Sequence, residues 1–157
     1  MKKFAYTARI VEEDGEHIIL VDDFPEVLLS MGQEVNEREA IRSLTLDAVK
    51  NAIQARIDYQ DDVPTQSAGQ TPEGGFEVTL PPMVCAKIAL YEEVRKRGMT
   101  KTSFAKAVGI TPTDASRLLD VFHETRQDIL LLAFRRLGVE IYTDVTVREI
   151  PSNARMA

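Results

Sequence analysis

The residues best placed to do chemistry lie in one short stretch, GMTKTSFAKAVGITPTDASRLLD, which spans residues 98–120. Two short helices are predicted there, one starting after Thr100 and one after Thr111, because threonine is a favoured N-cap residue. Gly109 lies between them, where a tight turn is needed. Two helices joined in this way allow the second to lie in the major groove of DNA while the first crosses the backbone. The alternative is a solvated helix pair that binds nothing.

The charges around this helix pair favour a polyanion. Residues 95–117 contain six lysines and arginines and a single acid, Asp114. The free N–H groups at a helix start suit phosphate oxygens, and Arg117 has the forked geometry that binds the edge of guanine. The sequence therefore predicts a DNA-binding surface formed by polar positions of both helices: Thr100, Lys101, Thr102, Lys106, Thr111, Thr113, Asp114, Ser116 and Arg117.

The first 82 residues have the alternating pattern of a sheet. A hairpin turn is predicted at Asp14–Gly15 and a second turn at Phe24–Pro25. One long helix is predicted, with Asn36 as its N-cap and Glu39 resembling the second member of a capping box. The predicted strands cover residues 4–11, 17–22, 27–31 and 76–80. This order of elements predicts an α+β domain of the βββαβ type.

Two apolar stripes run along the predicted long helix at helical spacing. One stripe suits a sheet, and the other favours a partner surface. The stripes consist of Ile41, Leu44, Ala48 and Ala52, and of Leu46, Val49, Ile53 and Ile57. A polar loop is predicted over residues 60–75, and Pro81–Pro82 ends the last strand because proline cannot continue a ladder. We therefore predict a domain boundary after residue 82.

The remainder of the chain is predicted to be helical, with a terminal strand. A helix over 84–96 precedes the helix pair, and a fourth helix runs from Thr125 to Leu137, where Gly138 ends it. Residues 141–150 alternate like a strand, and a lone strand is unstable unless it pairs. Residues 151–157 are predicted to be a disordered tail.

The fourth helix carries more apolar surface than one buried face requires. A two-fold dimer explains both this excess and the unpaired terminal strand. The alternative is a thicker monomer core with the strand folded back on its own chain. The predicted dimer contacts are Ile129, Leu132, Phe134, Ile141, Val145 and Val147.

Charge divides the chain at the same boundary. Residues 1–82 carry a net charge of -9 and residues 83–157 a net charge of +3, within a total of -6. An acidic half suits a basic protein and a basic half suits a polyanion, although two solvated surfaces are the alternative. No apolar run approaches the ~20 residues that span a bilayer, so we expect a cytoplasmic protein. The single cysteine, Cys85, excludes an internal disulfide, and no metal or cofactor is predicted.

An acidic cluster at Asp22, Asp23 and Glu26 raises the question of catalysis by carboxylate-bound Mg²⁺. No other residues complete a two-metal site, and adjacent acids beside a turn are more often solvated. His17 lies on a predicted strand and His123 on a predicted turn, with no nucleophile pattern between them. The sequence therefore predicts a protein that is not an enzyme.

Residues 84–139 resemble the DNA-binding domain of the Cro/repressor superfamily. The resemblance rests on a pattern of capping, small and apolar residues, here Gly98, Thr100, Phe104, Ala105, Gly109, Ile110 and Thr111, followed by Ser116–Arg117. One departure is Leu119, where many members of the superfamily have an acid or an amide. The resemblance implies an all-α helix-turn-helix domain.

Both halves together resemble HicB, the antitoxin of HicA–HicB toxin–antitoxin pairs, over about residues 3–150. The N-terminal part of this resemblance rests on an acidic glycine turn followed by VDDFPEVLLSMG, and the C-terminal part on RLLDVFHETRQDILLLAFRRLG. It implies a partial RNase H-like domain over 1–82 that lacks catalytic carboxylates. It also implies a helix-turn-helix domain over 83–150 that dimerises, binds operator DNA and represses its own operon.

The same resemblance implies a partner, a small basic HicA-type toxin that cleaves mRNA. The acidic N-terminal half is then the expected docking side. The expected toxin contacts are Glu12, Glu13, Asp14, Asp22, Asp23, Phe24 and Glu26. A stand-alone transcription regulator, with an N-terminal domain that senses a small molecule, is the alternative that the sequence leaves open.

Overall fold

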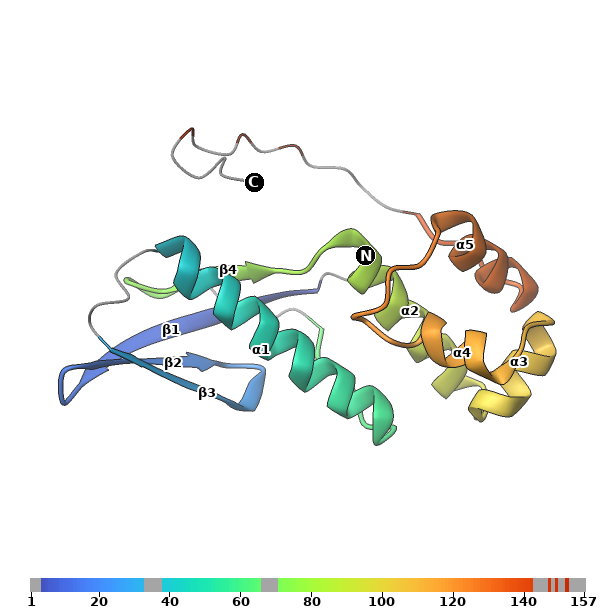
Figure 1. Ribbon diagram of the computed structural model, residues 1–157, viewed down its shortest axis with the longest axis horizontal. Helices are drawn as coiled ribbons and strands as arrows, with labels where there is room; N and C mark the ends of the chain where they lie inside the picture. Colours follow the sequence, from blue (N-terminus) through green and yellow to red (C-terminus); the bar gives the residue numbers. More distant parts are fainter. Residues whose placement is uncertain are drawn as a thin grey trace.

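The computed structural model describes residues 4–32, 38–65 and 71–142, together with Val147, Glu149 and Ser152. A four-stranded sheet and one long helix form one end of an elongated molecule, three short helices form the other end, and α2 lies between them (Figure 1). In chain order the elements are β1 (Ala5–Glu13), β2 (Glu16–Val21), β3 (Phe24–Gly32), α1 (Arg38–Asp58), β4 (Phe76–Thr79), α2 (Pro82–Lys96), α3 (Lys101–Val108), α4 (Pro112–Leu118) and α5 (Gln127–Arg136). The α+β class predicted from the sequence is confirmed.

The sheet has the order β3-β2-β1-β4, and its neighbouring strands are antiparallel. Asp14 and Gly15 form the β1–β2 turn with φ angles of 49° and 80°. Positive φ at both central residues is the geometry of the favoured two-residue hairpin turn. The turn predicted at this position is therefore confirmed.

The second turn lies two residues earlier than the sequence predicted. Val21 pairs with Phe24, so Asp22 and Asp23 make the β2–β3 turn, and β3 already includes Phe24 and Pro25. Proline is tolerated there because β3 is an edge strand, on which a missing N–H donor faces no neighbour. The register shifts between Leu20 and Val21, next to this tight connection.

Helix α1 covers one face of the sheet (Figure 1). Tyr6 and Phe24 are both buried, with ring centroids 4.8 Å apart in an edge-to-face arrangement. The buried residues of α1 are Ile41, Thr45, Val49, Ala52, Ile53 and Ile57. Leu44, which was predicted to share an apolar stripe with Ile41, is instead 49% exposed.

The C-terminal end of α1 meets the helical half of the chain, which consists of α2 to α5, whereas the sheet half consists of β1 to β4 and α1. Oε1 of Gln54 accepts a hydrogen bond from the amide of Val121 at 2.8 Å. The hydroxyl of Tyr91 donates to the carbonyl oxygen of Asp61 at 2.6 Å, and Ile57 lines a cleft with Tyr91. One continuous set of buried residues therefore runs across the proposed boundary at residue 82, which stays a prediction.

Helix α5 begins later than predicted. Its N-cap is Arg126 rather than Thr125, no side chain caps it, and the buried hydroxyl of Thr125 has no hydrogen-bond partner. Ile141 and Tyr142 belong to no strand. The rest of the strand predicted over 141–150, including Val145, and the tail predicted over 151–157 lie outside the described residues, except Val147, Glu149 and Ser152.

Candidate functional site

Helices α3 and α4 each begin at a threonine that caps the backbone. Oγ1 of Thr100 accepts from the amide of Ser103 at 3.1 Å, and Oγ of Ser103 accepts from the amide of Thr100 at 2.8 Å, which completes a capping box. Oγ1 of Thr111 accepts from the amide of Asp114 at 3.1 Å and donates to its carboxylate at 2.9 Å. Both N-caps predicted from the sequence are confirmed.

The turn between the two helices depends on Gly109. Its φ of 74° is left-handed, a conformation that L side chains rarely adopt. A Cβ built on Gly109 would also lie 2.6 Å from Nη1 of Arg136, whose guanidinium donates to the carbonyl oxygen of Val108. Arg136 of α5 thus holds the end of α3, a role that the sequence alone did not reveal.

Phe104, Ala105 and Val108 of α3 and Ala115 and Leu118 of α4 are buried, and most polar positions of both helices are exposed. Among the predicted DNA contacts only Ser116 is half-buried. The exposed ones are Thr100, Lys101, Thr102, Lys106, Thr111, Thr113, Asp114 and Arg117. Leu119, the departure from the resembled pattern, is 3% exposed and serves the core rather than the surface.

The cations of this surface are available to a ligand. Lys101 and Lys106 make no ion pair with any residue that the structure describes. Nη1 of Arg117 lies 3.6 Å from Oδ1 of Asp114, in an exposed pair three residues apart on α4. Exposed pairs of this kind contribute at most about 1 kcal/mol, so a phosphate or a base edge is able to displace the carboxylate.

Lys87 of α2 is the main residue that sequence reasoning missed. Its side chain is fully buried, and its Nζ donates to the carbonyl oxygens of Arg117 at 3.0 Å, Asp120 at 2.7 Å and His123 at 2.5 Å. An ammonium group has three N–H donors, so each of the three carbonyl oxygens receives one. The only sequence signal was a lysine within the apolar run VCAKIAL. Lys87 fixes the C-terminal end of α4 and the loop that follows.

Burial disfavours the charged form of this amine. It lowers the pKa of Lys87 from its usual 10.5 to about 8, while Asp120 opposes the shift. The ammonium form therefore persists at neutral pH.

The loop after α4 is also held from the sheet side. Besides the bond between Gln54 and the Val121 amide, Nζ of Lys50 lies 4.6 Å from the centroid of the Phe122 ring. Lys50 and Gln54 belong to α1, whereas Lys87 belongs to α2. The loop is consequently clamped between the long helix of the sheet half and the first helix of the helical half.

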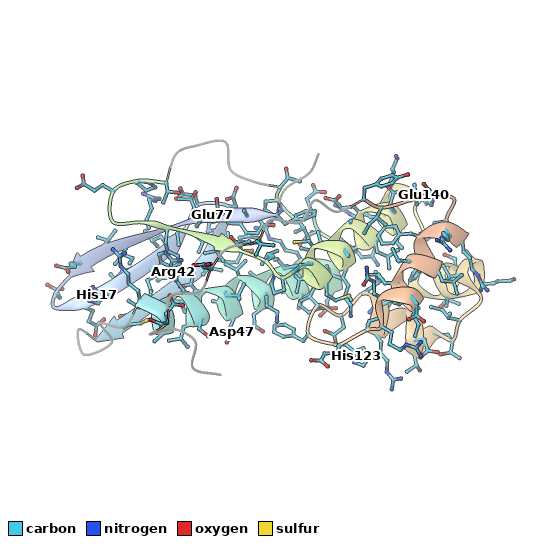
Figure 2. The ribbon with its side chains drawn as sticks, turned by 90° about the horizontal axis from the view of Figure 1, so that it is seen from above. His17, Arg42, Asp47, Glu77, His123 and Glu140 are labelled. Carbon is cyan, nitrogen blue, oxygen red and sulfur yellow. The ribbon has the colours of Figure 1, made fainter. Side chains whose placement is uncertain are left out.

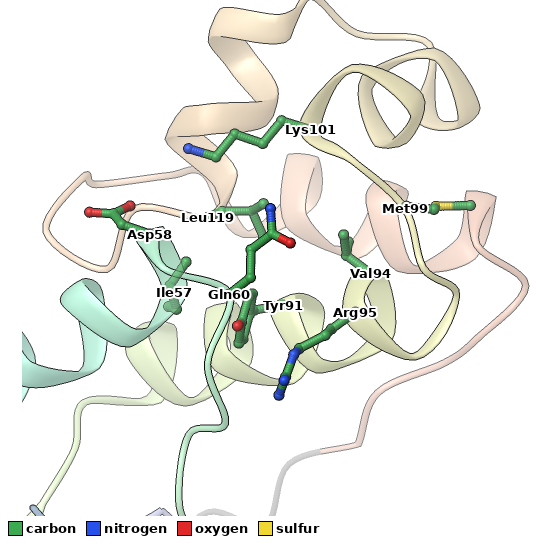
Figure 3. A pocket seen from close by; sticks show the side chains of 9 residues that line it. All are labelled: Ile57, Asp58, Gln60, Tyr91, Val94, Arg95, Met99, Lys101 and Leu119. Carbon is green, nitrogen blue, oxygen red and sulfur yellow. The ribbon is translucent and has the colours of Figure 1, made fainter.

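A cleft of about 270 Å³ opens where the two halves meet (Figure 3). Its charged residues, Asp58, Arg95 and Lys101, come from α1, α2 and α3 respectively. Arg95 is engaged with Asp62, which lies in the segment after α1. Leu119 and Met99 form part of its apolar lining.

The acids expected to meet a toxin do not form one cluster. Glu12, Glu13 and Asp14 lie exposed at the β1–β2 hairpin, whereas the other four expected residues lie at or beyond the opposite end of β2 (Figure 1). There Asp22 pairs with Arg9 at 2.7 Å.

The acids at that far end are tied to their own chain, and the aromatic residue is buried. Glu26 pairs with Arg56 at 2.7 Å, which lowers the pKa of Glu26 through a hydrogen bond. Asp23 is half-buried. Phe24 has no exposed surface, so it is a core residue rather than a surface available to a partner.

The structure separates the groups that would have to meet in a catalytic site. His17 lies near the sheet end of the molecule and His123 in the helical half, far from it (Figure 2). Among residues 4–32, 38–65 and 71–142 and the three further described positions, no group of three or more potential metal ligands comes together.

The predicted dimer contacts divide into exposed and buried residues. Ile129 and Leu132 of α5 are 43% and 42% exposed. Phe134 is 3% exposed, so its apolar surface is already taken up by the core of its own chain. Ile141 is half-buried and Val147 is exposed, and Val145 lies outside the described residues.

Comparison with known proteins gives one family. A family model described as the HicB-like antitoxin of a bacterial toxin–antitoxin system matches residues 3–89. Antitoxin HicB of Pseudomonas fluorescens (strain Pf0-1) is 25% identical over 142 residues, which cover 90% of this chain and 94% of that protein. Antitoxin HicB of Escherichia coli (strain K12) is 26% identical over 132 residues, which cover 82% and 88%. No helix in the described part of the chain is long and apolar enough to cross a membrane.

Proposed function

Because this chain belongs to the HicB-like antitoxin family, we propose that it neutralises a small basic HicA-type toxin and represses its own operon. The sheet half, a partial RNase H-like domain, binds the toxin. The helical half forms a helix-turn-helix dimer that binds operator DNA. In this proposal the protein is a cytoplasmic regulator without catalytic activity.

The observation that carries the DNA-binding part is the surface of α3 and α4. Two capped helix starts and the free cations of Lys101 and Lys106 lie on one helix pair, with Arg117 on the second helix. Helix N-termini and lysines suit phosphates, and an arginine on the second helix suits a guanine edge. The first helix then positions the protein on the backbone while the second reads the bases.

The dimer part rests on the exposed apolar residues of α5. Ile129 and Leu132 are both exposed in the monomer. A two-fold contact between two copies of α5 buries the apolar surface of these side chains. A dimer also places two copies of α4 on one duplex, which requires a separation of about 34–36 Å.

The toxin part rests on charge and on the family. The matched region, residues 3–89, contains the whole sheet and α1, and residues 1–82 carry the net charge of -9. Complementary charge speeds encounter with a basic partner and discriminates against acidic ones.

The alternative of a ligand-sensing regulator requires a pocket that holds the ligand. The cleft between the halves is about 270 Å³, slightly below the range of about 300–1,000 Å³ that is usual for small-molecule sites. It lies between the halves rather than within the N-terminal domain, where the sequence placed the sensor. A second, more open hollow of about 420 Å³ lies within the sheet half, lined by Glu26, Ala55, Arg56, Tyr59, Asp61 and Asp62. Pocket volume therefore does not separate the two functions, and it is the family match that favours the antitoxin.

Co-expression tests the proposal. The full chain is produced with the small basic protein encoded beside it, and the two are co-purified. The same chain is then titrated onto the DNA upstream of its own gene and onto scrambled DNA. The proposal predicts a stable complex, rescue of growth from the toxin and preference for the upstream DNA. If the chain does not bind the toxin, the toxin-binding part of the proposal is wrong. If it does not prefer the upstream DNA, the operator-binding part is wrong.

A further inference from the structure

The face of the sheet opposite α1 carries an apolar patch. Side chains alternate across a strand, so the residues that do not face α1 share this second face. The register places Val11 opposite Ile18 on β1 and β2, and Leu20 opposite Leu28 on β2 and β3. These four residues form a stripe across three strands, which we call the open sheet face. Arg9, opposite Leu20, and Ser30, opposite Ile18, lie beside them on the same face.

The exposure of this stripe is unusual for an antiparallel sheet. Such sheets commonly bury one face and place polar side chains on the other. Here Leu28 is 66% exposed, Val11 is 43% exposed, and Ile18 and Leu20 are half-buried. Apolar surface held in water over several strands marks an interaction site more often than chance placement.

Carboxylates that lack an ion-pair partner among the described residues border the patch at the β1–β2 hairpin, although Ser30 donates a hydrogen bond to Glu16. Glu13 and Glu16 are directly opposite each other and belong to the same face as Val11 and Ile18. Like charges in that position destabilise a sheet. Neither glutamate, nor Asp14 in the turn, forms an ion pair with any residue that the structure describes. By contrast, acids at the other end of the sheet are neutralised by Arg9 and Arg56.

We propose that the open sheet face, with the carboxylates of the hairpin, is the surface that binds the toxin. The assignment rests on the proposed antitoxin function and names the part of the sheet half that carries it. The partner places an apolar patch against Leu28 and Val11, and its cations against Glu13 and Glu16. Residues 4–32, which form these three strands, contain seven carboxylates and one arginine, so the complementary surface is basic.

Charge argues against a second copy of this chain as the occupant. A two-fold contact through the open sheet face would bring the same acidic hairpin of both chains toward one interface. Like-charge juxtaposition across an interface costs several kcal/mol. A basic partner relieves the repulsion between Glu13 and Glu16, whereas a second copy adds to it.

The first experiment compares two exposed leucines. Leu28→Glu changes the open sheet face, and Leu44→Glu is the matched control on the opposite layer, since Leu44 lies on α1 and is 49% exposed. Full-length chains are co-expressed with the toxin encoded beside them, and affinity is measured by titration. Leu28→Glu is expected to weaken toxin binding about tenfold or more, as for a central interface residue, and Leu44→Glu to leave it unchanged. Leu28→Ser serves as the second variant if Leu28→Glu does not fold.

The second experiment separates binding from folding. The double variant Glu13→Gln, Glu16→Gln removes the like-charge pair, so its thermal midpoint is expected to stay equal or rise. Its toxin affinity is expected to fall several-fold at low salt, and the difference from the original chain to shrink at high salt. A purely structural role for these residues would not combine unchanged stability with weaker binding.

The outcomes are distinguishable. If the original chain does not bind the toxin at all, the proposed function fails, and this assignment with it. If the original chain binds but both Leu28 variants bind equally well, the open sheet face is not the docking surface, although the antitoxin function stands. If Leu28→Glu changes the mass in solution but not toxin affinity, a second copy occupies the face, which also overturns the assignment.

Discussion

The two halves of the molecule satisfy their backbone polar groups in different ways. The sheet half does so mainly through ladders between β1, β2, β3 and β4, and none of the charged side chains described there is fully buried. The helical half is built of short helices, whose last carbonyl groups have no partner within the helix. There, cationic side chains donate to these carbonyl oxygens. Lys87 binds the end of α4 and Arg136 binds the end of α3. Arg97 binds the carbonyl oxygen of Leu137, directly after α5.

This contrast changes what the charge of each half means. The net charge of +3 over residues 83–157 includes cations that bind carbonyl oxygens of their own chain. Lys87 is fully buried, whereas Lys101, Lys106 and Arg117 remain exposed. Net charge alone therefore overstates the surface that is available to DNA, and the location of each cation decides its role.

The largest expected effect concerns the core of the sheet half. Phe24→Ala removes a fully buried ring that contacts Tyr6, so it is expected to lower the free energy of unfolding by about 4 kcal/mol. Tyr59→Ala is the matched control, because Tyr59 is 81% exposed, and its stability should hardly change. Urea unfolding measures both. If Phe24→Ala lowers the free energy of unfolding by less than about 1 kcal/mol, Phe24 is not a core residue and is again a candidate toxin contact.

A slightly smaller effect is expected from the buried cation of the helical half. Lys87→Met leaves three carbonyl oxygens without their donor, and the loss of stability is expected to be about 3 kcal/mol. Lys96→Met, at an exposed position of the same helix, should cost less than about 0.5 kcal/mol. Because Lys87 fixes the end of α4, operator binding should weaken while toxin binding persists. Equal free energies of unfolding for the two variants would show that the hydrogen bonds of Lys87 do not stabilise the fold.

A third test concerns the start of α4. Thr111→Ala removes the cap that receives the amide of Asp114, so stability should fall by about 1 kcal/mol. Thr111→Ser keeps the hydroxyl and is the control. Thermal unfolding of the two variants gives the difference. An alanine variant as stable as the serine variant would show that the cap contributes nothing measurable.

The last test concerns the pH dependence of stability that the buried Lys87 should cause. The folded chain releases the Lys87 proton near pH 8, whereas the unfolded chain holds it until about pH 10.5. Between these values the unfolded state binds more protons, so the contribution of Lys87 to the free energy of unfolding rises with pH. Burial also raises the pKa of Cys85 from 9 to about 11, so the contribution of Cys85 to the free energy of unfolding falls with pH. Because Cys85 is present in both chains, its contribution cancels when the original chain is compared with Lys87→Met. A stability difference that stays constant from pH 8 to 10 would contradict the shift.

Local signals in the sequence predicted the parts of the site that depend on neighbouring residues. Asp14–Gly15, the caps at Thr100 and Thr111, and the turn at Gly109 are all of this kind, because each needs only a few residues to define its geometry. The strand and helix order of the sheet half followed from periodicity for the same reason.

Contacts between distant residues were not predictable in this way. Lys87 reaches carbonyl groups 30 to 36 residues away, and its spacing gives no sign of them. Phe24 stands beside Asp22 and Asp23 in the sequence, which made it look exposed, but the turn directs it into the core. Val49, Ile53 and Ile57 of the second α1 stripe are buried in the core of their own chain, so the partner surface predicted there is not a free surface.

The central claim is that one chain binds a toxin with its sheet half and DNA with its helical half. The most direct measurement titrates two full-length variants against both ligands: Leu28→Glu, and the triple variant Lys101→Ala, Lys106→Ala, Arg117→Ala. The account predicts that Leu28→Glu loses toxin affinity about tenfold and keeps its operator affinity, while the triple variant loses operator affinity, with a shallower salt dependence, and keeps the toxin. Equal losses of both affinities in either variant would contradict the division of function between the two halves.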